Sequence, residues 1–92
     1  MDETHALTDQ NTLLLYGTDH CHLCDRAESL VAEALADERY SWVYEKVDIS
    51  DSEPLFERYG WLIPVLATPA GAELRWPFDA STLEAFLLNS QP

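Results

Sequence analysis

The amino-acid sequence predicts an α/β domain whose elements follow the order βαβαββα, with a four-stranded mixed sheet and three helices. Three observations carry this prediction: two apolar runs flank a long amphipathic stretch, a proline opens a later pair of short runs around a turn, and a capped apolar stripe ends the chain. A chain of 92 residues has room for one core. We therefore expect a single domain over residues 1–92, with residues 1–11 as a polar N-terminal extension.

The first half of the chain has the pattern of a βαβ unit. Residues 12–16 are an apolar run ended by Gly17, which predicts a strand buried on both faces. From Cys21 onward, apolar residues recur at helical spacing, and most charged residues fall on the opposite side. Residues 42–49 are rich in aromatic and β-branched residues and predict a second strand. The helix between the two strands forms a crossover, so the strands should be parallel neighbours.

The second half predicts a short helix, a hairpin and a last helix. A short apolar stripe ended by Gly60 predicts the first of these. Residues 64–68 and 72–76 are separated by turn-forming residues, which indicates a β-hairpin. Ser81, followed three residues later by a glutamate, forms a capping box that should open a helix to about Asn89.

Charge limits the partners that this chain can take. Seventeen acidic and five basic residues give a formal net charge of −12, which repels nucleic acid and anionic lipid. The longest apolar runs fall far short of the roughly 20 residues that a membrane-spanning helix needs. The N-terminal residues lack the basic and apolar segments of a secretory signal. We expect a cytoplasmic monomer that binds neither nucleic acid nor membranes, and any protein partner should be basic.

Both cysteines of the chain, Cys21 and Cys24, stand at the start of the predicted long helix, directly after a predicted strand. The first turn of a helix offers unpaired N–H groups and the positive end of the dipole, which favour a thiolate. Cys21 would lie at that end and attack a disulfide, and Cys24 would resolve the mixed disulfide formed at Cys21. A reducing cytosol does not sustain structural disulfides. The pair therefore predicts a thiol–disulfide oxidoreductase that reduces or exchanges the disulfides of proteins or small thiols.

Two alternatives remain open at this point. Cys21 and Cys24 with His20 and His22 are enough ligands for zinc, although immediate neighbours converge poorly on one tetrahedral centre and no second ligand pair follows. A related option is an iron–sulfur cluster bridged between two protomers through Cys21. The other alternative is a non-catalytic binding module that holds a basic partner on its acidic surface. We expect no resident metal and no tightly bound cofactor.

The sequence resembles a known family at three places. These are Cys21-His22-Leu23-Cys24 after the first strand, Ile63-Pro64-Val65-Leu66 at the start of the third, and Trp76-Pro77-Phe78-Asp79 before the last helix. Together with the element order, they resemble small bacterial glutaredoxin-like proteins, within the glutaredoxin-like branch of the thioredoxin fold. The resemblance covers residues 13–88. It implies a cis peptide bond before Pro64, with the backbone of Ile63 beside the reactive sulfur, where it pairs with the incoming thiol compound.

The chain departs from the glutaredoxins that use glutathione. Thr18 stands where they commonly carry a lysine that meets a glutathione carboxylate. Trp76-Pro77-Phe78 stand directly before Asp79, where those glutaredoxins place glycines. The resemblance still implies that Asp79 and Ser81 could meet the amino group or a carboxylate of glutathione. The departures and the net charge of −12 count against glutathione as the natural substrate.

Residues next to the cysteines should tune the attacking thiolate. A protonated imidazole at His22 would favour the thiolate of Cys21, whereas the carboxylate of Asp19 would oppose it. In the fold that the resemblance implies, Trp61 and Trp76 flank the site.

Overall fold

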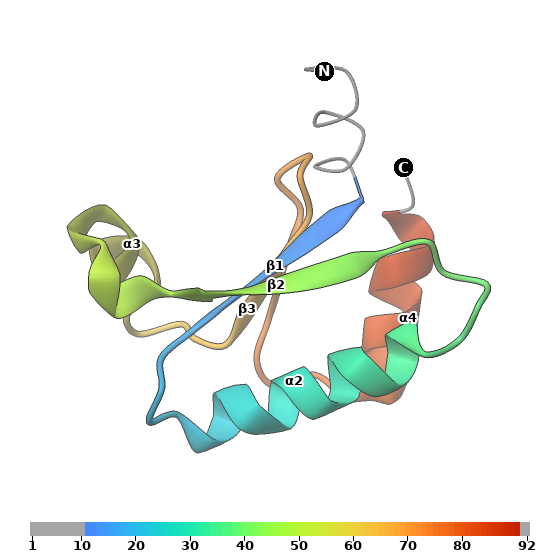
Figure 1. Cartoon of the computed structure of the whole chain (residues 1–92), viewed down its shortest axis with the longest axis horizontal. Helices are drawn as coiled ribbons and strands as arrows, with labels where there is room; N and C mark the ends of the chain where they lie inside the picture. Colours follow the sequence, from blue (N-terminus) through green and yellow to red (C-terminus); the bar gives the residue numbers. More distant parts are fainter. Residues whose placement is uncertain (1–10, 91–92) are drawn as a thin grey trace.

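The computed structural model describes residues 11–90, which form a four-stranded sheet and three α-helices (Figure 1). In chain order the elements are β1 (Thr12–Gly17), α2 (His22–Leu35), β2 (Val43–Asp48), the 3₁₀ helix η1 (Ile49–Asp51), α3 (Glu53–Tyr59), β3 (Val65–Ala67), β4 (Glu73–Arg75) and α4 (Ala80–Asn89). The predicted class and the order βαβαββα are therefore confirmed. The expected polar extension over residues 1–11 lies, apart from Asn11, outside the described residues.

The sheet has the order β2-β1-β3-β4. β1 and β2 are parallel, β3 is antiparallel to β1, and β4 is antiparallel to β3. The carboxyl ends of β1 and β2 consequently meet at one end of the sheet, and α2 begins at that same end (Figure 1). This end, with the neighbouring α3, is called the redox end below.

The two faces of β1 are covered to different extents. Leu13 and Leu15 are fully buried in the main core between the sheet, α2 and α4. Leu14 and Tyr16 point to the opposite face and are only half-buried. Tyr16 stacks on Tyr59 of α3, with 4.3 Å between ring centroids. The prediction of a strand buried on both faces is therefore wrong for one face, because the short α3 covers only one end of it.

The second strand is shorter than predicted. Trp42 lies before β2 and is buried in the main core, where its indole N–H donates to the carbonyl of Leu87 at 3.4 Å. Ile49 belongs to η1, because the carboxylate of Asp48 accepts a hydrogen bond from the N–H of Ser50 and caps this 3₁₀ helix. Val43 is 54% exposed, since it begins an edge strand at the end of the sheet away from α3 (Figure 1).

The hairpin forms at the predicted turn, with β3 and β4 each shorter than the predicted runs. The backbone N–H of Thr68 donates to the carbonyl of Ala72 at 2.9 Å, and the Thr68 hydroxyl accepts from the N–H of Ala72 at 3.1 Å. Gly71 has φ of +100°, a conformation that favours glycine. The turn therefore needs this glycine.

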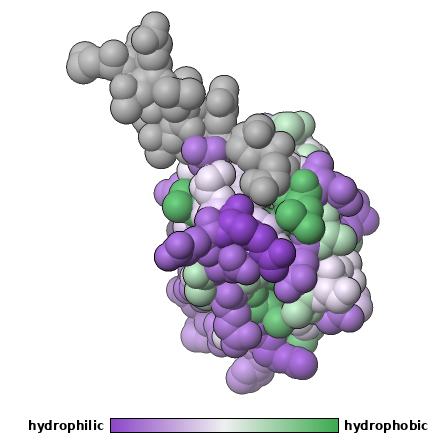
Figure 2. All heavy atoms as spheres, turned by 90° about the vertical axis from the view of Figure 1, so that its right-hand side faces the viewer, coloured by the Kyte–Doolittle hydropathy of each residue, from purple (hydrophilic) through white to green (hydrophobic). Residues whose placement is uncertain are grey.

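The surface agrees with the acidic composition. Figure 2 views the molecule from the side on which α4 lies and shows mostly hydrophilic side chains, with hydrophobic ones in separate small patches. Within residues 11–90, no helix is both long enough and apolar enough to cross a membrane.

Candidate functional site

The cysteine pair lies at the start of α2, as the sequence predicts. Cys21 is the N-cap residue, with an extended backbone, and its sulfur accepts a hydrogen bond from the N–H of Cys24 at 3.1 Å. The two residues form a disulfide, with 5.1 Å between their Cα atoms. The start of a long helix thus holds both sulfurs, and one N–H of its first turn, that of Cys24, is directed at the sulfur of Cys21.

The two sulfurs differ in how far they are exposed. Cys21 is partly exposed, whereas Cys24 is only 7% exposed and lies on the interior side of α2. Cys24 is also packed against Gly17 at the end of β1: a Cβ added at Gly17 would lie 2.8 Å from the Cys24 sulfur. The sequence indicates Gly17 only as the end of a strand, and its role as the space for Cys24 follows from the tertiary packing.

The pairing of β3 with β1 brings Pro64 to the end of the sheet where the two cysteines lie. β3 pairs with β1 so that Val65 lies opposite Tyr16, and continuing this antiparallel register by one residue brings Pro64 opposite Gly17. Pro64 is fully buried, its carbonyl accepts from the N–H of Trp76 at 3.2 Å, and the Ile63–Pro64 peptide bond is cis. Ile63 is half-buried and packs with the smaller core under α3. The fold therefore brings the cysteines and the Ile63–Pro64 segment to the same end of the sheet.

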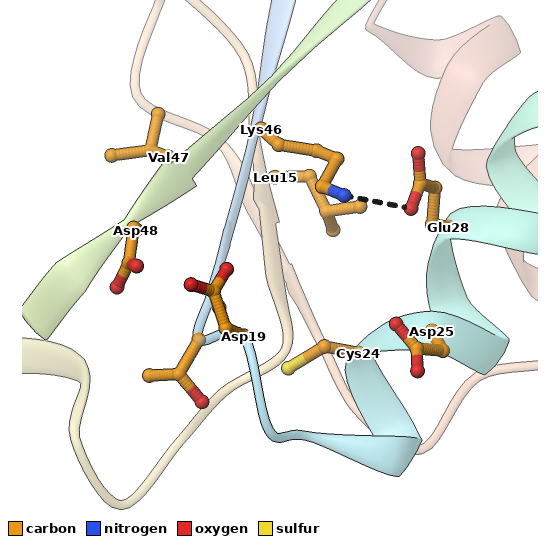
Figure 3. Close-up of a pocket in the computed structure, with 10 residues that line it drawn as sticks. Leu15, Asp19, Cys24, Asp25, Glu28, Lys46, Val47 and Asp48 are labelled. Atoms are coloured by element: carbon orange, nitrogen blue, oxygen red, sulfur yellow. Dashed lines mark ion pairs between the residues drawn. The ribbon is translucent and has the colours of Figure 1, made fainter.

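A cavity of about 270 Å³ opens beside Cys24, between α2 and the ends of β1 and β2 (Figure 3). It is lined by Leu15, Gly17, Thr18, Asp19, Cys24, Asp25, Glu28, Lys46, Val47 and Asp48. Glu28 is held by both carboxylate oxygens: one lies 3.2 Å from the ammonium of Lys46 and the other accepts from the hydroxyl of Tyr44 at 2.9 Å. The hydrogen bond and charge of Glu28 raise the pKa of Lys46.

The charges around this cavity are unequal, because four carboxylates and one ammonium line it. The ammonium of Lys46 is already paired with Glu28. A thiolate on Cys24 would therefore add a negative charge beside four carboxylates, with the one ammonium already paired.

The predicted tuning residues lie beside the pair. Asp19 is exposed and lines the cavity, and Figure 3 shows the Cys24 sulfur directed towards the space where Asp19 lies. His22 is exposed in the first turn of α2. Trp61 is 98% exposed, whereas Trp76 is partly buried and packs edge-on against Phe78, with 5.0 Å between ring centroids.

Asp79 and Ser81 lie apart from the cavity, at the start of α4. The prediction that Ser81 caps this helix is wrong. Asp79 is the N-cap residue, and its carboxylate accepts from the N–H of Thr82 at 2.8 Å. Because the helix then begins at Ala80, Ser81 already belongs to the first turn and is exposed. The hydrogen bond from Thr82 holds the pKa of Asp79 below its usual range.

A shallow groove separates α2 from the start of α4. It is lined by Arg26, Ser29, Leu30, Glu33, Trp76, Pro77, Phe78, Asp79, Ala80 and Thr82. The guanidinium of Arg26 lies 5.8 Å from the ring centroid of Trp76, over its face. No local sequence pattern indicates this contact, because the two residues are far apart in the chain. Asp79 therefore lines this groove and not the cavity.

The described residues do not assemble a metal site. Within residues 11–90, no three side chains of His, Cys, Asp or Glu lie together in a way that could hold a metal ion. The sulfurs of Cys21 and Cys24 are bonded to each other in this state. The zinc alternative therefore has no preassembled ligand set in this part of the chain.

Known proteins share this arrangement of sequence and fold. A family model described as "Glutaredoxin-like domain (DUF836)" matches residues 12–88. None of the curated proteins compared with the chain matches it. The X-ray structure of target protein XcR50 from X. campestris is 44% identical, with a TM-score of 0.73, and the match covers 87% of this chain and 99% of that one.

Two further structures are more distant. Protein Ne2328 from Nitrosomonas europaea is 27% identical, with a TM-score of 0.62 over 83% of this chain and 89% of that one. The oxidised thioredoxin from Plasmodium falciparum is 16% identical, with a TM-score of 0.64 over 100% of this chain and 93% of that one. At that identity the last match speaks for the fold alone. The fold is thioredoxin-like, and the disulfide-bonded pair within it supports a redox role through thiol–disulfide chemistry.

Proposed function

The chain belongs to the glutaredoxin-like domain family (DUF836), and from this membership we propose that it is a thiol–disulfide oxidoreductase that reduces or exchanges the disulfides of proteins or small thiols. One observation carries the proposal. Cys21 and Cys24 form a disulfide at the start of a 14-residue helix, where the first sulfur is partly exposed and the second is buried. This difference in access is what a pair with separate attacking and resolving roles requires.

The proposed reaction starts from the reduced pair. The Cys21 thiolate attacks one sulfur of the substrate disulfide, a mixed disulfide forms, and the first substrate thiol leaves with a proton from solvent. Cys24 then loses its proton and attacks the sulfur of Cys21, which releases the second substrate thiol. The substrate gains two electrons and two protons, and the pair becomes the disulfide seen here. Return to the dithiol needs two electrons from a thiol reductant, either two small monothiols or one protein dithiol.

Neighbouring residues take positioning roles in this proposal. The backbone of Ile63 pairs with the substrate, and Pro64 fixes that backbone beside the cysteines, supported by the register that brings Pro64 opposite Gly17. His22, when protonated, favours the Cys21 thiolate, and the exposed carboxylate of Asp19 opposes it.

Asp79 and Ser81 are proposed to contact a small-thiol substrate through the groove between α2 and α4. The carboxylate of Asp79 caps α4 and is exposed to solvent, which supports its contact with a ligand in the groove. Thr18 offers no cation to a glutathione carboxylate, and the net charge of −12 repels an anionic tripeptide. Glutathione is therefore a weak substrate in this proposal.

Opposing charges set the proposed potential. The helix N-terminus and the N–H of Cys24 favour a thiolate at Cys21, whereas Asp19 and Asp25 oppose it. A modestly stabilised thiolate makes a reductant or mild exchanger, with a potential nearer thioredoxin's roughly −270 mV than the roughly −120 mV of a periplasmic oxidant. Such a protein would act in the reducing cytoplasm as a monomer, with a basic protein as the favoured partner.

Trapping tests the proposal directly. The Cys24→Ser variant should accumulate mixed disulfides at Cys21 when it is incubated with a small disulfide or with insulin, as measured by mass spectrometry. The Cys21→Ser variant is the matched control and should form few adducts, because Cys24 is buried. Wild-type protein that reduces neither substrate, or adducts that form mainly on Cys24, would contradict the proposal.

A further inference from the structure

Exposed apolar side chains gather at the redox end. Among residues 11–90, five large apolar side chains are exposed: Leu23, Val43, Phe56, Trp61 and Leu88. Leu23, Phe56 and Trp61 belong to the first turn of α2, to α3 and to the loop after α3, which lie at the redox end (Figure 1). Val43 and Leu88 belong to the start of β2 and the end of α4 at the other end, where the hydrophobic patches in Figure 2 are small and separate.

Trp61 is held in this exposed position by the backbone around it. The N–H groups of Leu62 and Ile63 donate to the carbonyl of Tyr59, at 2.8 and 3.1 Å, and the side chains of Leu62 and Ile63 pack inward. The indole of Trp61 is 98% exposed on this ordered turn. An aromatic side chain of this size buries about 150–250 Å² when it is covered, so a partner that covers Trp61 removes a comparable apolar area from water.

The neighbouring Phe56 extends the same surface. Gly60 follows α3 so tightly that a Cβ there would lie 2.6 Å from the Phe56 carbonyl and 3.5 Å from the Phe56 ring. Phe56 is therefore adjacent to the residue that precedes Trp61, and 54% of it is exposed. Leu23, 42% exposed, stands between the two cysteines. Leu23 therefore lies beside the disulfide, while Phe56 and Trp61 lie on and directly after α3 at the same end of the sheet.

Trp61 is close enough to the substrate segment to contact a bound polypeptide. Trp61 precedes Ile63 by two residues, which span at most about 7 Å. A polypeptide that pairs with the backbone of Ile63 advances about 3.3 Å per residue. A bound polypeptide therefore extends far enough within two or three residues to reach Trp61, whereas a small disulfide has no chain that continues beyond the paired segment.

The charge around this surface selects the partner. Two segments at the redox end, residues 18–26 and 49–61, carry five carboxylates, all exposed: Asp19, Asp25, Asp51, Glu53 and Glu57. The same segments carry two guanidiniums. That of Arg58 is paired with Glu73 at 3.6 Å, and that of Arg26 lies over Trp76. A cationic polypeptide is therefore attracted to this end, and an anionic one is repelled.

We propose that Leu23, Phe56 and Trp61 form a docking surface for a basic polypeptide that carries the substrate disulfide, with Trp61 as its main contact. The inference rests on the proposed function, since the docked disulfide is the one that Cys21 attacks. It narrows the substrate to the polypeptide class and adds no chemical step to the reaction. The apolar side chains supply the contact area, and the carboxylates supply attraction and selectivity.

A comparison of three disulfide substrates tests this surface. The reduced full-length protein is assayed with bis(2-hydroxyethyl) disulfide and with two disulfide-bonded peptides of equal length, one rich in lysine and one rich in glutamate. We expect kcat/KM to be highest for the cationic peptide and to fall as salt rises, because screening weakens long-range attraction. Trp61→Ala should lower kcat/KM for the cationic peptide about tenfold relative to the small disulfide. Leu88→Ala, which shortens an exposed apolar side chain at the other end, should leave this ratio unchanged.

The outcomes separate the docking surface from the proposed function. Wild-type protein that reduces none of the three disulfides refutes the proposed function. Reduction of the small disulfide with equal rates for the two peptides, or with an unchanged ratio in Trp61→Ala, overturns the docking surface alone. Concentration-dependent dimers in analytical ultracentrifugation that disappear in Trp61→Ala would assign the surface to a second copy of the chain and would also overturn it. Far-ultraviolet circular dichroism of Trp61→Ala checks that the variant is folded.

Discussion

Replacing Gly17 with alanine should destabilise the oxidised protein and make its disulfide easier to reduce. The new Cβ would lie 2.8 Å from the sulfur of Cys24 and 3.1 Å from its Cβ. Non-bonded heavy atoms in good contact lie about 3.5–4.0 Å apart, so the sulfur has to move by roughly 1 Å. Overpacking of this kind costs about 1–3 kcal/mol. The lost freedom of glycine in the unfolded chain offsets about 0.4–1 kcal/mol of that cost.

The cost should depend on the redox state of the pair. In the reduced protein the side chain of Cys24 can relieve part of the clash with the added methyl group by rotating, whereas in the oxidised protein its bond to Cys21 fixes the sulfur. If the oxidised form is destabilised by about 1–2 kcal/mol more than the reduced form, the potential becomes less negative by about 20–45 mV. Urea unfolding of both forms gives the stabilities, and a glutathione redox titration gives the potential.

A double-mutant cycle isolates the contribution of the Cys24 sulfur to this loss of stability. Cys24→Ala removes the atom at 2.8 Å and leaves only the 3.1 Å contact with the Cβ. Under reducing conditions, Gly17→Ala should therefore cost less in the Cys24→Ala background than in the wild type. An equal cost in both backgrounds, or a potential that stays constant or becomes more negative, would refute the assignment of Gly17 as the space for this sulfur.

Three other predictions concern ionisable groups. Iodoacetamide should alkylate Cys21 in the Cys24→Ser variant faster than Cys24 in the Cys21→Ser variant, with a Cys21 pKa modestly below the ordinary value of about 8.5; a thiolate that persists below about pH 5 would show that the carboxylates do not balance the helix dipole. Asp79→Ala should lower the melting temperature, because it removes the capping hydrogen bond that holds the pKa of Asp79 below its usual range. The stabilisation by this carboxylate is present above the pKa of Asp79 in the unfolded chain and is lost as pH falls through its pKa in the folded protein. The melting temperatures of wild type and variant should therefore converge in acid. Burial and the hydrogen bond to Glu73 raise the pKa of Tyr59 to about 12. The stabilisation by the protonated phenol should therefore be complete below about pH 10 and lost between about pH 10 and 12, as measured by ultraviolet titration and by unfolding. Tyr59→Phe should lose less stability over that range.

The parts of the fold that sequence predicts correctly are those that depend on local patterns. The position of Cys21 at a helix N-terminus follows from the helical spacing after it and from the strand that ends at Gly17. The hairpin follows from its turn residues, with Gly71 in the conformation that only glycine adopts easily. Each of these features is decided within about 15 residues of chain, where spacing and turn chemistry outweigh distant contacts.

The parts that sequence misses depend on distant contacts. The pairing of Glu28 with Lys46 and Tyr44 joins α2 to β2 and has no signature at short range. The exposure of Val43 depends on the edge position of β2 in the sheet, which the composition of residues 42–49 does not reveal. The choice of Asp79 over a serine two residues later as the cap depends on where the preceding loop leaves the backbone extended. In each case two or more elements have to be in place before the outcome is decided.

The acidic redox end also affects how copies of this protein meet one another. An oxidised copy is itself a disulfide-bearing polypeptide, and a reduced copy is a dithiol, so electrons could pass between them without net change. Two molecules of charge −12 repel each other, and their exposed carboxylates beside the cysteines would have to approach most closely. Electron transfer between copies should therefore be slow, and each molecule should exchange electrons mainly with its partners.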